Sequence, residues 1–166
     1  MVKNITKNYL AQQFVSLCNT APLKDITVKD IISYCDISKQ TFYNHFRDKA
    51  DLMNYVFVLA SHPLVEDMDD SIDGLRKGTI LMAKVCLANK RFYSQLVRYK
   101  TQNNFAQYFL KSCEEILQNK LIRRGCNMDN YTKHILHTYC LGICNYFVEW
   151  ILHDMIETPE QVADVH

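Results

Sequence analysis

The sequence predicts an all-α fold, with an N-terminal helix-turn-helix domain at residues 1–60 and a C-terminal helical domain at residues 61–166. Apolar residues recur at the i, i+3, i+4 and i+7 positions of amphipathic helices along nearly the whole chain. Only 4 Gly and 3 Pro occur in 166 residues, which argues against the turn-dense all-β folds. A composition of 48% hydrophobic and 22% charged residues is typical of a globular chain with its own core.

Four helices are expected in the first domain. Their expected ranges are about 4–20, 27–35, 39–46 and 49–60. The first ends ahead of Pro22, because the residue before a proline disfavours the α conformation. Thr27 and Ser38 are suitable N-cap residues for the second and third helices. Between these helices, Asp36 lies in a tight turn where the backbone needs a left-handed residue, a conformation that Asp tolerates better than most residues.

Longer helices are expected in the second domain, after a boundary at His62-Pro63. Their expected ranges are about 71–89, 91–100, 103–124 and 129–156, with a short last helix within about 159–165. Gly125 is a helix stop, because it tolerates the left-handed conformation that ends many helices. Thr158 followed by Pro159 has the pattern of a helix start.

The helix expected at about 129–156 has an apolar sector too wide for one packing partner. Its aromatic and aliphatic residues form two displaced stripes, so this helix needs its own domain's core and a second partner, which we predict to be another copy of the chain. The residues assigned to this dimer interface are Tyr139, Ile143, Tyr146, Phe147 and Trp150. The alternative is that the segment is the central core helix of a monomer.

Two short helices joined by a tight turn, at about 27–35 and 39–46, form the pattern of a helix-turn-helix. In the second of them Phe42 and Phe46 point inward, and the outward positions carry no acidic residue. Lys can donate hydrogen bonds to guanine, Gln and Asn can pair with adenine, and Tyr and Thr hydroxyls suit phosphate oxygens. The pattern therefore predicts a helix that enters the major groove of double-stranded DNA. An ordinary surface helix is the alternative, and the formal net charge of +1 does not decide between the two.

These residues strongly resemble a known family, the TetR/AcrR transcriptional regulators. The resemblance to their N-terminal domain lies in residues 26–31 and 37–52, above all in Thr-Phe-Tyr-Asn-His-Phe at 41–46. In addition, residues 141–160 resemble a branch of that family that includes activators of dihydroxyacetone-kinase operons.

The resemblance implies a homodimer bound to double-stranded DNA. Helices one to three would form the DNA-binding unit, helix four would link it to a regulatory and dimerisation domain, and the last two long helices would pair across the two-fold axis. The residues expected at the DNA are Thr27, Ser38, Lys39, Gln40, Thr41, Tyr43, Asn44, His45 and Lys49. One departure is Asp36, where the family usually has Gly; an acidic group there would weaken or tune DNA binding.

The function expected from these features is that of a cytoplasmic, sequence-specific transcriptional regulator. As a dimer it would bind a palindromic operator under the control of a small-molecule effector or a protein partner. The rival hypothesis is a helical coregulator with the same fold and little DNA affinity of its own, which a weak dependence of binding on salt would indicate. An enzyme is disfavoured, because the sequence has no nucleophile elbow, phosphate loop or local Cys-His signature.

No membrane span, signal peptide, metal or other cofactor is expected. The purely apolar runs are only a few residues long. His134, His137, Cys140 and Cys144 share a helix face, but one straight helix cannot surround a tetrahedral ion. The seven Cys are expected to be reduced thiols, most of them in the core.

Overall fold

A computed structural model describes residues 5–66, 71–99 and 105–164. Over these residues the chain forms α-helices joined by turns and has no strand, as the all-α prediction requires. The expected helix start at 103 and the expected helix end at 165 lie outside the described residues. The helices are α1 (Ile5–Cys18), α2 (Val28–Tyr34), α3 (Lys39–His45), α4 (Lys49–Glu66), α5 (Ile72–Ala88), α6 (Lys90–Arg98), α7 (Phe105–Arg123), α8 (Asn130–Leu152) and α9 (Pro159–Ala163).

Local signals in the sequence set most of these boundaries. Thr27 caps α2 and Thr158 caps α9, and each forms a capping box with the acidic or amide side chain three residues on. Ser38 caps α3, where its Oγ accepts a hydrogen bond from the backbone N–H of Thr41. The turn between α2 and α3 contains Asp36 at a φ of 51°, which confirms the left-handed conformation predicted there.

Two helix ends differ from the prediction. The helix α4 continues through Pro63 to Glu66 instead of ending near residue 60, although Pro63 has no N–H to donate to the helix. The helix α8 ends at Leu152 rather than near 156, because Asp154 and Met155 reverse the chain at φ values of 62° and 51°. This strained turn brings the Met155 side chain into the core, where it is almost fully buried.

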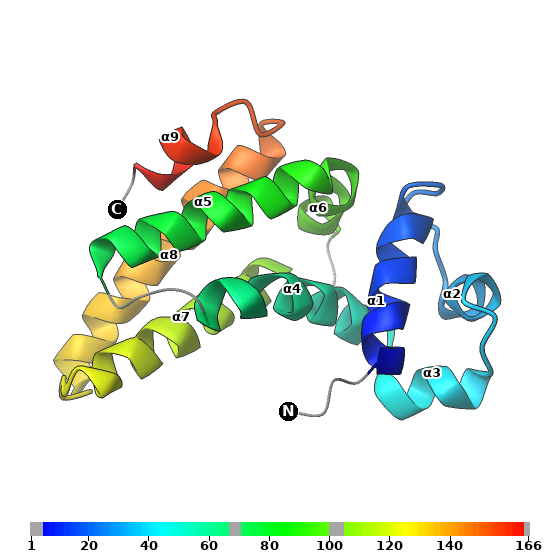
Figure 1. Ribbon diagram of the computed structural model, residues 1–166, viewed down its shortest axis with the longest axis horizontal. Helices are drawn as coiled ribbons and strands as arrows, with labels where there is room; N and C mark the ends of the chain where they lie inside the picture. The colour runs from blue at the N-terminus through cyan, green and yellow to red at the C-terminus, as the bar shows by residue number, and fades with distance from the viewer. Residues whose placement is uncertain (1–4, 67–70, 100–104, 165–166) are drawn as a thin grey trace.

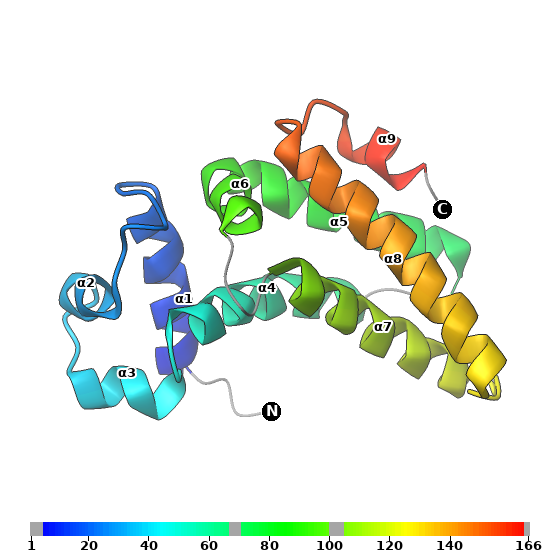
Figure 2. The same cartoon turned by 180° about the vertical axis from the view of Figure 1, so that it is seen from behind.

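The helices form two groups that share one continuous hydrophobic core. As Figure 1 shows, α1, α2 and α3 lie at one end of the molecule and α5 to α9 at the other, while α4 runs from the first group into the second. The view from behind shows α7 and α8 side by side, which agrees with their extensive packing (Figure 2). Between the two groups, the rings of Phe14 on α1 and Phe92 on α6 meet edge to face at 6.0 Å.

By length and composition alone α8 could cross a membrane, with a mean hydropathy of 1.2 in its most apolar 18 residues. From the short apolar runs of the sequence, no membrane span is expected. The length and composition of α8 are weak support for a span, because a core helix of a helical protein meets the same criteria. Consistent with a core helix, α8 packs against both α7 and α6.

Candidate nucleic-acid interface

The helix α3 is held to the first group of helices by one narrow apolar stripe. Phe42 and Phe46 are almost fully buried, and their ring centroids lie 5.9 Å apart. Phe46 in turn contacts the ring of Tyr55 on α4 at 5.5 Å, and the Tyr55 hydroxyl donates a hydrogen bond of 2.6 Å to Asn8 on α1. Because these anchors lie on one side, the opposite face of α3 is left open to solvent.

The open face of α3 carries the polar side chains that the sequence predicts there. Lys39, Gln40, Tyr43 and Asn44 are exposed, Tyr43 to 47%. Gln40 Nε2 donates a hydrogen bond of 2.8 Å to Asn44 Oδ1, and the Lys39 ammonium lies 5.9 Å from the centroid of the Tyr43 ring. The amide pair retains N–H donors and the Gln40 carbonyl acceptor, which match the donor and acceptor pattern of adenine in the major groove. The described face therefore combines amide, ammonium and phenol groups and includes no acidic residue of α3.

The cap hydroxyls that flank this face are already engaged. The Thr27 hydroxyl donates a 2.6 Å hydrogen bond to the Asp30 carboxylate, which also accepts from the Thr27 backbone N–H. These two hydrogen bonds lower the pKa of Asp30. Since a hydroxyl has one proton to donate, Thr27 can donate to a phosphate only by giving up its bond to Asp30. The Ser38 and Thr41 hydroxyls lie 2.8 Å apart and share one hydrogen bond.

Lys49 is expected from the family resemblance to contact a DNA phosphate. In the structure its ammonium has partners within the chain. Its ammonium donates hydrogen bonds to the backbone carbonyls of Leu23 and Ile26, at 2.9 and 2.6 Å. It also lies 4.6 Å from the centroid of the Tyr99 ring. This half-buried lysine therefore joins α4 to the loop between α1 and α2.

Two further residues bear on this surface. His45, at the end of α3, is half-buried rather than fully presented to solvent. Arg47 directly follows α3 and was not singled out in the sequence; its side chain is 84% exposed, with its Nε 3.8 Å from Asp51. The sequence feature that could have identified Arg47 is its position as a basic residue next to the predicted DNA-contacting helix.

The five residues of the predicted dimer interface differ in burial, and their assignment to an interface stays a prediction. Phe147 and Trp150 are only 4% and 3% exposed, and their rings lie 5.2 Å apart in the chain's own core. Tyr139 is 39% exposed, and Ile143 and Tyr146 are half-buried. Tyr139 and Ile143 also line a cavity between helices. The period of the apolar stripe could not show which of the two stripes on α8 faces outward, since both have helical spacing.

A different set of residues forms the outer face of α7 and α8. A shallow groove of about 170 Å³ runs between these helices, lined mainly by aliphatic side chains. The residues that line it are Ala106, Gln107, Leu110, Leu141, Cys144, Asn145 and Val148. Beside it lies Gly142, which is exposed and has no neighbouring atom within 4 Å of where a side chain would begin.

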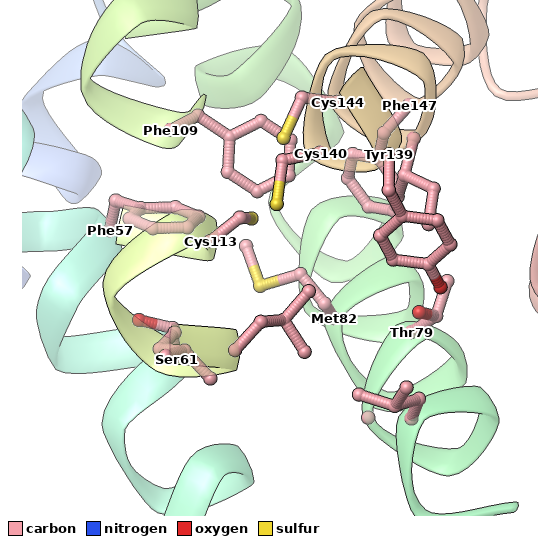
Figure 3. Close-up of a pocket in the computed structure, with 15 residues that line it drawn as sticks. Phe57, Ser61, Thr79, Met82, Phe109, Cys113, Tyr139, Cys140, Cys144 and Phe147 are labelled. Carbon is pink, nitrogen blue, oxygen red and sulfur yellow. The ribbon is translucent and has the colours of Figure 1, made fainter. Parts of the chain in front are cut away.

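A cavity of about 130 Å³ lies among α4, α5, α7 and α8 (Figure 3). Among the described residues that line it, none is charged, and the hydroxyls come from Ser61, Thr79 and Tyr139. The remaining lining residues are Phe57, Leu75, Gly78, Met82, Phe109, Cys113, Ile116, Leu117, Cys140, Ile143, Cys144 and Phe147. The volume is close to that of an engineered protein cavity that binds benzene.

Sulfur atoms gather along one side of this cavity, from Cys113 on α7, from Cys140 and Cys144 on α8, and from Met82 on α5 (Figure 3). Burial raises the pKa of Cys140 to about 12, and a hydrogen bond with Cys144 together with burial raises the pKa of Cys113. The thiols of Cys113 and Cys140 are therefore protonated and poorly nucleophilic at neutral pH. Over the described residues, no group of three or more His, Cys, Asp or Glu is placed to hold a metal ion.

Two family models match the chain in succession. The model described as bacterial regulatory proteins, tetR family, matches residues 17–56, which include α2 and α3. The model described as transcriptional regulator C-terminal region matches residues 73–165, more than half of the chain. The first match falls mainly on the helices of the first group and the second match on those of the second group.

Relatives and solved structures agree with these matches. The chain is 25% identical over 142 residues to the HTH-type dhaKLM operon transcriptional activator DhaS of Lactococcus lactis subsp. lactis (strain IL1403), covering 86% of this chain and 73% of that relative. The structure of dihydroxyacetone kinase operon activator DhaS matches with a TM-score of 0.69 and 23% identity, over 97% of this chain and 91% of that one. That of NalD, the secondary repressor of the MexAB-OprM multidrug efflux pump in Pseudomonas aeruginosa, matches with a TM-score of 0.53 and 18% identity, over 96% and 90%. At these identities the two structures establish a shared fold.

Proposed function

The chain belongs to the TetR family of transcription regulators, and from this premise we propose that it binds a palindromic operator as a homodimer. Each subunit would place α3 in the major groove, and the two copies would reach successive grooves about 34 Å apart on one side of the DNA. The site of action would be the cytoplasm, where the operator is found.

The observation that carries this proposal is the open, acid-free face of α3. Gln40 and Asn44 offer hydrogen-bond groups for base edges, Lys39 offers an ammonium for guanine or phosphate, and the exposed Tyr43 hydroxyl suits a phosphate oxygen. Arg47 adds an exposed cation next to this face. Thr27 and Lys49 contribute less than the family pattern implies, because both are already bonded within the chain.

The outer face of α7 and α8 is proposed as the dimer interface. The groove that contains Leu110, Leu141 and Val148 is apolar enough to favour burial, and Gly142 allows a second helix to approach closely. This arrangement leaves Phe147 and Trp150 in the core of each subunit, on the inner side of the helix that would form the interface.

The cavity among α4, α5, α7 and α8 is proposed as the effector site. Because it holds about 130 Å³ and its described lining has no charged group, it suits a compact, uncharged and mainly apolar molecule rather than a sugar or a phosphate. A ligand that fits one arrangement of α4, α5, α7 and α8 better than another would shift the population of dimers with the operator spacing.

The effector proposal is tested by thermal unfolding with small molecules of matched size. Indole and toluene are expected to raise the melting temperature, while glycerol and glycerol phosphate leave it unchanged at equal concentration. The variant Cys140→Phe, which fills the cavity, is expected to lose the response. A response to glycerol phosphate but not to indole would contradict the proposed chemistry.

The operator proposal is tested by selecting bound fragments from random double-stranded DNA with the purified protein. A palindromic consensus and a steep fall in affinity with salt are expected, because phosphate contacts release counterions. The second candidate function is a coregulator with little DNA affinity of its own, which the acidic Asp36 beside α3 favours. No enriched sequence and no dependence on salt would support that candidate and refute operator binding.

A further inference from the structure

The end of α6 is bonded to the loop that leads into the DNA-binding helices. Gln95 lies on α6, is half-buried, and has both polar atoms of its side-chain amide engaged by this loop. Its Nε2 donates a 3.2 Å hydrogen bond to the carbonyl of Cys18, the last residue of α1. Its Oε1 accepts a hydrogen bond from the backbone N–H of Leu23.

The same loop is held a second time from the start of α4. The Leu23 carbonyl accepts a hydrogen bond from the ammonium of Lys49, which also bonds the carbonyl of Ile26 and faces the ring of Tyr99. The backbone of Leu23 is therefore bonded on its N–H side by α6 and on its C=O side by α4. Its side chain is also buried, as is that of Ile26.

This doubly held loop connects directly to α2. Thr27 caps α2 one residue after Ile26, and α2 packs against α3. A rotation of α1 and the loop relative to α6 must therefore move α3 as well. The opposite side of α6 packs on α8, where Arg98 Nη2 donates a 3.0 Å hydrogen bond to the carbonyl of Leu152. Thus α6 connects the helix that borders the proposed dimer interface to the unit that carries α3.

The two kinds of contact between α1 and α6 differ in how strongly they fix an angle. The edge-to-face contact of Phe14 and Phe92 is apolar and tolerates rotation, because burial has little directional preference. The two hydrogen bonds of Gln95 are directional and weaken steeply when their angles change. Among the described contacts that join α1 and its following loop to α6, the side-chain amide of Gln95 therefore does most to fix the orientation of α1 relative to α6.

We propose that Gln95 is a positioning residue that fixes the angle of the α1–α3 unit against α6, and hence the half-site separation that the dimer accepts. The proposal rests on the proposed function, operator binding by a dimer. Gln95 does not touch DNA; it acts through the Cys18 carbonyl and the Leu23 amide.

The test measures affinity for a series of operators whose two half-sites are moved apart or together by one or two base pairs. The wild-type protein is expected to show a sharp optimum, since a shifted site forces the Gln95 hydrogen bonds to break. In Gln95→Ala that penalty is gone, so the preference for the optimal over the shifted spacing is expected to fall roughly tenfold. Gln118→Ala, a glutamine near the far end of α7, is the matched control and should keep the wild-type preference.

The outcomes separate the inference from the function on which it rests. A wild-type protein with no preferred spacing would refute the proposed function, and the inference with it. A sharp wild-type optimum that Gln95→Ala retains, or that Gln118→Ala also loses, would refute the inference alone. If Gln95→Ala does not fold, Gln95→Glu carries the test, because it keeps an acceptor for the Leu23 N–H and loses the donor to Cys18; retention of the sharp optimum by this variant would overturn the proposal.

Discussion

Replacing Lys49 with methionine distinguishes the partners seen in the structure from the phosphate contact expected from the sequence. Methionine keeps most of the aliphatic stem and removes the ammonium. In the structure, the loss falls on the carbonyls of Leu23 and Ile26, which lose a charged donor. If Lys49 instead faced DNA, the folded protein without DNA would be unaffected.

The expected loss of stability can be worked from the contacts of Lys49. A hydrogen bond to a charged group contributes about 1.5 to 3 kcal/mol, and two such bonds are removed. Because the side chain is only half-buried, water replaces part of this interaction, and we expect a net loss of about 3 kcal/mol. For a chain of this size that corresponds to a fall in melting temperature of roughly 6–12 °C.

Thermal unfolding at a fixed protein concentration measures this loss, since the stability of a dimer depends on concentration. The control is Lys24→Met, in the same loop but exposed, which should leave the melting temperature unchanged. The salt dependence of DNA binding by Lys49→Met should equal that of the wild type. An unchanged melting temperature, together with a salt slope lower by about 0.9 for each lost phosphate contact, would refute the placement of Lys49.

Three further predictions concern the DNA-binding unit. Tyr43→Ala should weaken operator binding similarly across sequences, whereas Gln40→Ala should change base preference; gel shifts with the selected operator and its single-base variants measure both, and wild-type binding by Tyr43→Ala would contradict the assignment. Asp36→Gly should change the melting temperature little, because relief of the left-handed strain of about 1 kcal/mol offsets the added entropy of the unfolded chain, and should tighten DNA binding at low salt by removing a negative charge; unaltered affinity at low salt would contradict this. The pKa of Asp30 is lowered by its hydrogen bonds with Thr27, so its contribution to stability is present above the unfolded-state pKa and is lost as pH falls through the folded-state pKa. Asp30→Asn should therefore lose less stability than the wild type in acid unfolding experiments, and parallel acid curves would contradict the assigned role.

Much of the local structure could be predicted from the sequence because its causes lie within a few residues. The caps at Thr27, Ser38 and Thr158 each depend on a partner three positions on. The left-handed turn at Asp36 follows from the short spacing between two helices. The open face of α3 is also local, since the positions of Phe42 and Phe46 determine which side of so short a helix is buried.

The sequence by itself determined the helices, their caps, the helix-turn-helix and the chemistry of its exposed face. Only the tertiary structure decided which stripe of α8 faces inward, that Lys49 bonds Leu23 and Ile26, and that α6 holds the loop before α2. The physical reason is distance along the chain. Helical periodicity reports that a face is apolar, but burial and hydrogen bonding between residues far apart depend on how the helices pack, and Gln95 and Cys18 meet across 77 positions of sequence.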